Sequence, residues 1–380
     1  AACGTLPNDP LPSPAPAPTL PTALMGAEAV EPLFASPSYG VQAFLWWQPD
    51  IDQWAHGRPP QPMTAVQEMG FGWVKQEFAW RDIEGIEKGA QDWWRPDQIV
   101  LAAEMAGLNL VARLDRQPEW AQPPGTPLQD NRPPQNLADY GDFCFAIADR
   151  YRGRIRAYQV WNEPNLSREW GGQPPDPAAY TELLRVCYEG IKRGDPAAIV
   201  ISAGLAPTGN DDAGAMSDIK FLQGMYAAGA SAYFDVLGVH APGYNAPPEV
   251  SPDEAAVTEL YGNGRWFAFR HVEDMRAIMV ANGDGRKQVA VLEMGWTLDE
   301  VNEEYAWFAV DEATQADYLV RAYQYAAEHW QPWISLMTTI YIADPNWTAA
   351  QEQWWWAIVL PDGTRRQAFF ALQAMEKMTE

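Results

Sequence analysis

Histidine is scarce in this chain of 380 residues, and its four copies, His56, His240, His271 and His329, show no ligand spacing. A metal site is therefore not indicated, because transition-metal sites combine closely placed His, Cys and carboxylate ligands. Basic residues are also few, 26 against 50 acidic ones, which gives a net charge of −24. Such a surface repels phosphate backbones, so nucleic-acid binding is not expected.

Long apolar runs are missing too, although 47% of the residues are hydrophobic. That content is ample for a packed core, but no run is long enough to span a bilayer as a helix. Cysteine occurs only as Cys3, Cys144 and Cys187. A chain of this length can form one large domain or two, and α/β barrels commonly reach this size as a single unit.

The N-terminal segment resembles a targeting signal. Ala1-Ala2-Cys3-Gly4 resembles the cleavage region of a bacterial lipoprotein precursor, with Cys3 as the acylated residue. Residues 6–22 then hold seven prolines among Ala, Ser and Thr, a composition typical of a stiff tether. We therefore expect residues 1–37 to form a lipoprotein-like N-terminus and linker. The protein would be extracytoplasmic, secreted or on a bacterial cell surface, and would meet the membrane only through a lipid anchor.

From about residue 38, short β-rich runs alternate with segments of helical periodicity. The predicted strands span residues 41–47, 73–78, 109–115, 157–163, 198–204, 235–240, 289–296 and 334–342. The predicted helices span residues 62–69, 95–106, 136–151, 177–193, 219–228, 266–281, 314–329 and 367–378. Eight strands, each followed by a helix, indicate a (β/α)₈ barrel over residues 38–380, with long βα loops. Residues 344–364 are expected to form a loop with a small hairpin over the barrel mouth.

Cys144 and Cys187 fall on the core-facing stripes of the helices that follow strands three and four. Free thiols packed in the core are the default expectation. A disulfide is the alternative, and it requires Cα atoms within ~7 Å and an oxidising compartment.

Two predicted strands carry a glutamate at the carboxyl end. In the first, Glu163 precedes Pro164, which cannot donate to a sheet ladder, so the backbone should leave the sheet there. In the second, Glu293 ends the apolar run that starts at Val289. Strands four and seven face each other across a barrel mouth, so the two carboxylates can lie ~5–5.5 Å apart. That spacing supports a covalent glycosyl-enzyme and net retention at the anomeric carbon.

The two glutamates would have different roles. Glu163 would act as the acid/base and Glu293 as the nucleophile, which must stay ionised. Because two close carboxylates raise one another's pKa, we expect one of them to keep its proton near neutral pH. Asn162 can donate a hydrogen bond to the 2-hydroxyl of the sugar.

Three segments carry a resemblance to a known group of enzymes. They are Trp161-Asn162-Glu163-Pro164-Asn165-Leu166 with Trp170 nearby, residues 73–84, and Leu292-Glu293-Met294-Gly295-Trp296. Together they resemble clan A glycoside hydrolases, most of all family 39, which includes β-xylosidases, α-iduronidases and exopolysaccharide endoglycosidases. The resemblance covers residues 38–379.

The resemblance also assigns residues around the substrate. Lys75 stands where these enzymes carry an arginine, and keeps the charge without the bidentate fork. His240 and Tyr244 match the end of strand six, and imply substrate positioning and a hydrogen bond to the nucleophile.

Tryptophan is abundant, with 19 copies, and flat indole rings make good stacking surfaces for sugars. Trp46 ends strand one and Trp296 follows strand seven, and we expect both at the barrel mouth. Trp354 is the candidate for the aromatic floor from the eighth βα loop, with Trp347 nearly as favoured.

The sequence thus predicts a single-domain retaining β-glycoside hydrolase that needs no cofactor and acts on an extracellular poly- or oligosaccharide. Tryptophans spread along the chain favour endo action, and an exo-acting β-xylosidase-like enzyme is the nearest alternative. A non-catalytic surface lipoprotein that binds glycans is the alternative from another class. The presence of both glutamates and Asn162 speaks against that alternative.

Overall fold

The structure, a computed structural model, describes residues 24–26, 28–51 and 60–378. Cys3 and most of the proline-rich segment lie outside these residues, so the acylated cysteine and the tether remain predictions. Within the described part of the chain, no helix is both long and apolar enough to cross a membrane.

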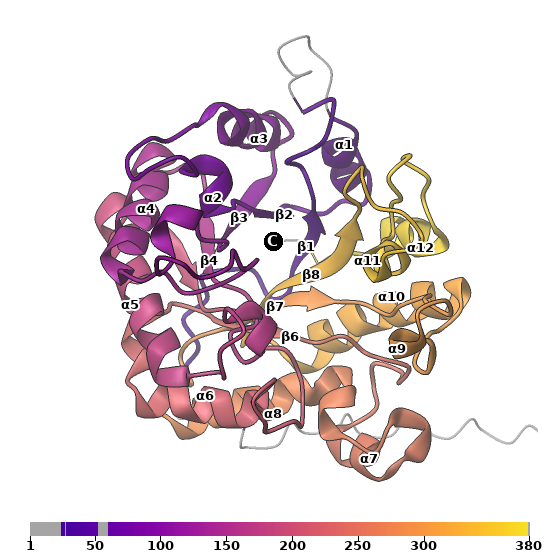
Figure 1. The fold of residues 1–380 in the computed structure, drawn as a ribbon. Helices are drawn as coiled ribbons and strands as arrows, with labels where there is room; N and C mark the ends of the chain where they lie inside the picture. The colour runs from indigo at the N-terminus through magenta and orange to yellow at the C-terminus, as the bar shows by residue number, and fades with distance from the viewer. Residues whose placement is uncertain (1–23, 27, 52–59, 379–380) are drawn as a thin grey trace, which may run out of the picture.

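Eight parallel strands form the barrel, with the helices packed around it (Figure 1). The strand order is β5-β4-β3-β2-β1-β8-β7-β6. Parallel bridges from Ile201 to Val236 and from Leu205 to Val239 join β5 to β6 and bring the ends of the sheet together. The predicted (β/α)₈ barrel is therefore confirmed.

The strands have the following bounds: β1 Ser38–Ala43, β2 Trp73–Glu77, β3 Asn109–Leu114, β4 Ala157–Val160, β5 Ile199–Ile201, β6 Leu237–His240, β7 Val289–Met294 and β8 Ile334–Ile342. The helices that follow them are α1 Gln61–Glu68, α3 Trp94–Met105, α4 Leu137–Arg150, α5 Pro177–Gly194, α6 Asp218–Ala227, α8 Val272–Ala281, α10 Glu312–His329 and α12 Gln367–Ala374. Short helices lie in the loops: α2 Trp80–Ile83, α7 Pro252–Val257, α9 Glu303–Ala306 and α11 Glu352–Trp356.

Side chains alternate along each strand between the barrel interior and the helix layer. Trp73, Val111 and Ala157 belong to the interior cluster, whereas Leu110 and Ala112 pack in the larger core with the helices. Two positions further along β2, β3 and β4, the same interior face carries a polar residue. These residues are Lys75, Arg113 and Gln159. The barrel is thus apolar at its amino end and polar at the end where its loops form a site.

The described part of the predicted linker packs on the amino end of the barrel. The carbonyl of buried Leu24 accepts a hydrogen bond from Arg276 Nε at 3.1 Å. The backbone amide of Phe34 donates to Gln288 Oε1 at 3.0 Å, and its ring lies 4.9 Å from that of Trp73. The packed structure therefore includes residues before the boundary predicted at residue 38.

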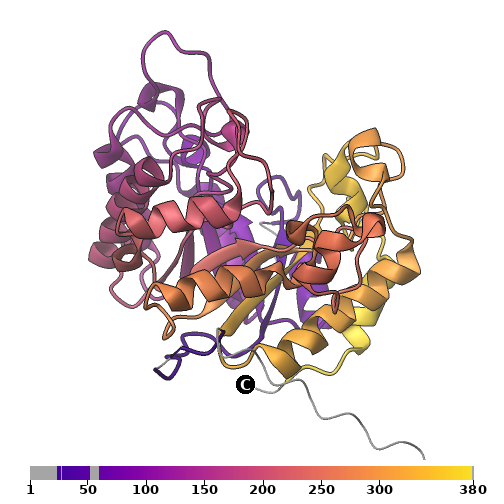
Figure 2. The same cartoon turned by 90° about the horizontal axis from the view of Figure 1, so that it is seen from below.

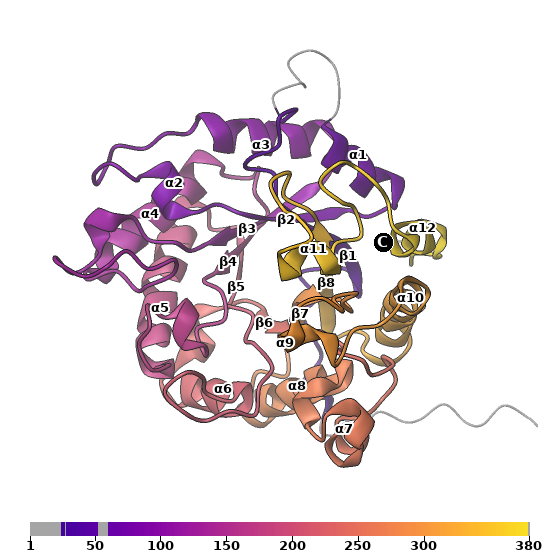
Figure 3. The same ribbon diagram turned by 45° about the vertical axis from the view of Figure 1, so that its right-hand side comes forward.

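The loops at the carboxyl ends of the strands rise above the barrel on two sides (Figure 2). On one side, α9 and α11 lie next to each other beside the ends of β7 and β8 (Figure 3). The insertion after β8 contains the predicted turn, closed by an antiparallel bridge between Val359 and Arg365. The helix α11 that precedes this turn was not predicted.

The helices α4 and α5 are joined by a disulfide between Cys144 and Cys187, whose Cα atoms are 5.3 Å apart. The default expectation of two free thiols is therefore wrong. Small residues let the two helices approach closely, since a Cβ on Gly190 would come within 2.4 Å of the Gly141 carbonyl oxygen. Both cysteines are fully buried, so the bond fastens two neighbouring barrel helices from within the core.

Replacing both cysteines by alanine should destabilise the barrel. The bond joins residues separated by 43 positions, and closing such a loop stabilises by about 4 kcal/mol in the chain-entropy model. For a chain of this size we expect the Tm to fall by roughly 5–10 °C in differential scanning calorimetry. Cys3→Ser is the matched control and should leave the Tm unchanged. An unchanged Tm in Cys144→Ala/Cys187→Ala would show that the bond contributes no stability.

Candidate active site

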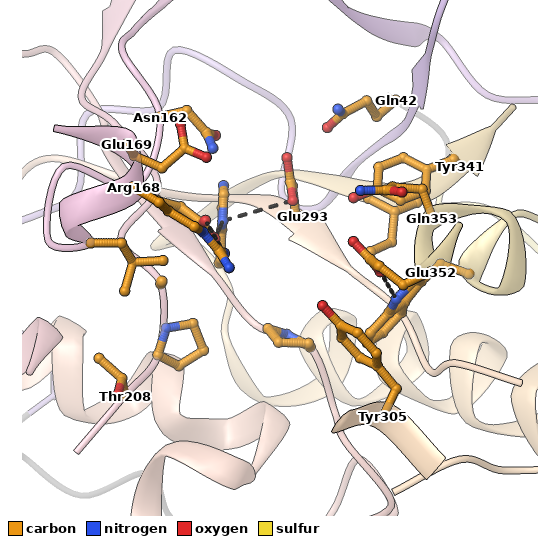
Figure 4. Close-up of a pocket in the computed structure, with 18 of the residues that line it drawn as sticks. Gln42, Asn162, Arg168, Glu169, Thr208, Glu293, Tyr305, Tyr341, Glu352 and Gln353 are labelled. Carbon is orange, nitrogen blue, oxygen red and sulfur yellow. Dashed lines mark hydrogen bonds and ion pairs between the residues drawn. The ribbon is translucent and has the colours of Figure 1, made fainter. Parts of the chain in front are cut away.

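A cleft of about 860 Å³ opens at the carboxyl ends of the strands, where the polar end of the barrel meets the loops. Glu163 and Glu293 both line it. Figure 4 shows Glu293 between two groups of side chains, with Asn162, Arg168 and Glu169 on one side and Tyr341 and Glu352 on the other. A cleft of this size between walls of different loops is typical of small-molecule and oligomer binding.

Glu163 reaches the cleft through an irregular turn. The strand predicted to run to residue 163 ends at Val160, because Trp161 adopts φ 71° and Glu163 φ 41°. Such left-handed conformations are uncommon for these residue types and cluster at functional sites. The turn is held by the buried Trp161 indole, which donates to the Glu169 carbonyl at 2.9 Å, and by Glu163 N, which donates to the Gly204 carbonyl at 3.0 Å.

Glu293 is brought opposite by β7. A register shift between β6 and β7 pairs His240 with Glu293, and such irregularities re-aim side chains next to active sites. One oxygen of Glu163, one oxygen of Glu293 and a ring nitrogen of His240 lie within 4.8 Å of one another. The two glutamates predicted to act together therefore do meet at the same end of the barrel.

Two cations hold the Glu293 carboxylate. Lys75, buried on β2, donates from Nζ to Glu293 Oε1 at 3.0 Å and to the Leu292 carbonyl at 3.0 Å. Arg113 on β3 lies 3.9 Å from the same oxygen. Burial raises the pKa of Glu293, but the charges of Lys75, His240 and Arg113 outweigh it and bring the pKa to about 2. Glu293 is thus ionised across the physiological range.

Glu163 has a different environment. His240 Nδ1 lies 2.9 Å from Oε1, and Arg168 donates to Oε2 at 3.3 Å. Burial raises the pKa of Glu163, but the hydrogen bond and charge of His240 and the charge of Arg168 bring it below its ordinary value. The expectation that one carboxyl keeps its proton near neutral pH is therefore wrong for this state of the site. The Arg168 side chain is 67% exposed, so this part of the stabilisation can be displaced.

The Glu163, His240 and Glu293 group also has a donor set that can hold a metal ion. Lys75 and Arg113 already supply positive charge to Glu293. Glu163 is already in contact with His240 and Arg168. A further cation would have to displace these partners, which makes this donor set better suited to protonic than to metal chemistry.

The other predicted polar residues divide between the cleft and the layer beneath it. Asn162 and Tyr244 line the cleft, and the Tyr244 hydroxyl lies 3.4 Å from the Pro207 carbonyl. His240 also lines it, but its hydrogen bond goes to Glu163 rather than to Glu293, the predicted nucleophile. Lys75 does not reach the cleft and contacts Glu293 instead of a substrate, because its side chain is only 1% exposed.

The predicted aromatic contacts need correction. Trp296 is fully buried beneath Gly243 and donates from Nε1 to the Ala246 carbonyl at 2.9 Å. Trp46 is half-buried against the core and does not line the cleft. Trp354 lines a separate hollow of about 440 Å³. The tryptophans that do line the cleft are Trp347 and Trp356.

Several cleft residues were missed at the sequence level. They are Gln42, Arg113, Arg168, Glu169, Tyr341 and Glu352. Gln42 and Arg113 could have been predicted to face the cleft, since each is a polar residue near the carboxyl end of a largely apolar strand. Tyr341 lies near the end of β8, and the other three lie on short helices in the loops, where no period in the sequence reports which way a side chain points.

Comparison with known proteins supports the architecture. No family model and no curated protein matches the sequence. Solved structures share the fold: a family 39 glycoside hydrolase from the gut symbiont Bacteroides cellulosilyticus WH2 has 19% identity and a TM-score of 0.63. The match covers 90% of this chain and 63% of that protein, so this chain spans less than two thirds of its length.

Two further structures share the barrel. GH5_18 from Streptomyces cattleya, in complex with GlcNAc, has 16% identity and a TM-score of 0.60, over 90% of this chain and 79% of the other. A GH10 endoxylanase from a sugarcane soil metagenome has 13% identity and a TM-score of 0.58, over 90% and 98%. These structural neighbours are clan A glycoside hydrolases, and at such identities the likeness establishes the fold.

Removing the ammonium of Lys75 should raise the pKa of Glu293. In Lys75→Met, burial of the carboxylate remains while its nearest cation is lost, so we expect the pKa to rise by ~1–3 units above the wild-type value. Glu293 would then be protonated at a higher pH than in the wild type. Carbon-13 NMR titration of glutamate δ-carbons measures this, with Glu293→Gln to assign the resonance.

Lys75→Arg is the matched control, because it keeps the charge and should keep the pKa low. An equal pKa in the wild type and Lys75→Met would show that His240 and Arg113 maintain the charge of Glu293 without Lys75.

Proposed function

We propose that the chain is a retaining β-glycoside hydrolase that uses Glu293 as nucleophile and Glu163 as acid/base. The observation that carries the proposal is the pair of carboxylates, whose nearest oxygens are within 4.8 Å, at the ends of β4 and β7. Inverting enzymes leave room for a water between carboxyl groups ~6.5–9.5 Å apart, so the short separation favours the covalent route. The barrel shared with clan A glycoside hydrolases supports it.

The chemistry has two steps. A Glu293 oxygen attacks the anomeric carbon, the bond to the leaving oxygen breaks, and Glu163 gives that oxygen a proton. Glu163 then takes a proton from water, the water oxygen attacks the anomeric carbon, and Glu293 leaves as a carboxylate. Lys75 and Arg113 keep Glu293 ionised for the first step and stabilise the charge that returns to it in the second.

The proton of the acid step must be held near Glu163. His240 Nδ1 and Glu163 Oε1 are 2.9 Å apart, so one proton can be shared between the ring and the carboxylate. A leaving group that enters between Glu163 and Arg168 would displace the guanidinium. Because the charge of Arg168 lowers the pKa of Glu163, its removal raises that pKa and favours the protonated acid.

We propose a poly- or oligosaccharide substrate. Support comes from aromatic side chains on several walls of the cleft: Phe44, Tyr305, Phe308, Trp347 and Trp356. Such rings can stack on sugar faces, while Asn162 lies on the cleft surface next to the acid/base and can bond the 2-hydroxyl.

We also propose an extracytoplasmic location, with Cys3 as the lipid attachment site. The Cys144–Cys187 disulfide supports this location, since such bonds persist in oxidising compartments and are rare in the cytosol. Mass spectrometry of the N-terminus in the native organism tests the anchor, and an unmodified Cys3 would contradict it.

Alanine variants of the two glutamates should differ in how azide rescues them. Glu293→Ala cannot form the covalent intermediate and should lose nearly all turnover, whereas Glu163→Ala should still form it from an activated aryl glycoside and then stall. Azide should restore turnover in both. Proton NMR should show a β-glycosyl azide from Glu163→Ala and an α-glycosyl azide from Glu293→Ala.

The matched control is Glu303→Ala, which removes an exposed carboxylate on α9 that does not line the cleft. It should keep the wild-type rate. An α-azide from Glu163→Ala, or wild-type rates in both variants on a natural glycan, would contradict the assigned roles. Absence of turnover on any glycoside, with retained glycan binding, would favour the non-catalytic binding protein.

A further inference from the structure

One side of the cleft carries polar groups without protein partners. This side, here called the open wall, consists of Gln42 on β1, Tyr341 on β8, and Glu352 and Gln353 on α11 (Figure 4). On the other side, Glu163, Arg168 and Glu169 make hydrogen bonds or ion pairs within the protein. Within the described residues, the side chains of the open wall make one such contact, from Trp356 Nε1 to Glu352 Oε2 at 2.7 Å. This asymmetry indicates that the side chains of the open wall have donors and acceptors available for hydrogen bonds to a ligand.

Gln42 has the most informative position on the open wall. The residue is only 3% exposed, and its Oε1 is buried without a partner among the described residues. Native proteins rarely leave a buried polar atom unpaired, so such an atom in a cleft calls for an explanation by a ligand. Gln42 pairs in register with Lys75, whose ammonium holds Glu293. A sugar attached to Glu293 would therefore stand close to this amide, which offers both an acceptor and donors.

Glu352 supplies the second group. Its Oε1 has no hydrogen bond or ion pair within the described residues, and burial raises its pKa to about 7. A carboxyl group without a cation can accept a hydrogen bond from a hydroxyl, and it disfavours another carboxylate beside it. The arginines of the cleft, Arg113, Arg116 and Arg168, are each held by a carboxylate away from the open wall.

We infer that Gln42 and Glu352 bind two hydroxyl groups of the sugar transferred to Glu293, and that this sugar is neutral rather than acidic. The inference rests on the proposed function, because it places the transferred sugar by its bond to Glu293. Gln42 and Glu352 would thus determine specificity, while Glu163 and Glu293 do the chemistry.

The charge of Glu352 is tested at pH 8, above its pKa of about 7, with a panel of 4-nitrophenyl β-glycosides of xylose, glucose, galactose, mannose and glucuronic acid. The wild type should favour a neutral member over the glucuronide. Glu352→Gln keeps an acceptor and removes the charge, so the ratio of kcat/KM between that neutral glycoside and the glucuronide should fall at least tenfold. Glu303→Gln is the matched control and should leave the ratio unchanged. A wild type that prefers the glucuronide, or an unchanged ratio in Glu352→Gln, would overturn the inference.

The amide of Gln42 is tested with substrates that lack one hydroxyl. The wild type should lose roughly 10- to 100-fold in kcat/KM on one monodeoxy glycoside, and Gln42→Leu should lose a similar factor on the parent but little more on that deoxy substrate. Its Tm should stay equal or rise, because the leucine replaces an unpaired buried amide. Gln42→Met serves as a second variant of similar volume. Equal losses on all substrates, together with a lower Tm in both variants, would mean that Gln42 has only a structural role.

A binding measurement separates this inference from the proposed function. Calorimetric titration with methyl β-glycosides of the same five sugars needs no turnover. Suppose that the wild type hydrolyses none of the aryl glycosides but binds a neutral sugar, and that Gln42→Leu weakens this binding at least tenfold. The proposed function then fails, while the open wall is supported as the surface that binds a neutral sugar. If Gln42→Leu and Glu352→Gln bind as the wild type does, or if nothing binds, the inference fails.

Discussion

Glu293 keeps its charge in a largely dehydrated position, because Lys75 Nζ lies 3.0 Å from its carboxylate and the Arg113 guanidinium 3.9 Å away. A buried carboxylate without such partners would take up a proton, and a protonated carboxyl is a poor nucleophile. The cations themselves are buried and need partners in turn. Arg113 is held by Glu77 and by Asp115 at 2.9 Å, so the site depends on a network that spans β2, β3 and β7.

The barrel makes this network possible because the interior face of its strands changes from apolar to charged along their length. Interior-facing positions are apolar near the amino ends of the strands, as at Trp73 and Val111, and charged two residues later, at Lys75 and Arg113. The turn after β4 carries Glu163, and the register shift between β6 and β7 directs Glu293 toward it. Catalytic geometry in such barrels belongs to strand ends and loops, while stability comes from the layers below. This division explains how one fold serves many glycosidic substrates.

The features that could be predicted from the sequence are those that depend on local periodicity, namely the order and type of the secondary-structure elements. Period-two runs and capped helices predicted the order of eight strands and helices. The proline after Glu163 predicted that a strand ends at residue 163. The strand ends three residues earlier, because Trp161 adopts a left-handed conformation. Side-chain direction in loops depends on tertiary contacts that no period reports. Trp354 points into a second hollow while Trp347 and Trp356 line the cleft, and Trp296 is covered by Gly243. The contact between Cys144 and Cys187 likewise depends on how closely two helices approach.

The central claim, that Glu293 attacks the sugar, is tested most directly by trapping the intermediate. A 2-deoxy-2-fluoro β-glycosyl fluoride of the preferred sugar should inactivate the wild type with time, since the fluorine slows both steps and the good leaving group favours the first. Mass spectrometry of the digested protein should find one sugar on the peptide that contains Glu293, and none in Glu293→Gln. A sugar attached to Glu163 or another carboxylate, or an enzyme that turns over natural glycans with inversion and accumulates no adduct, would contradict the account.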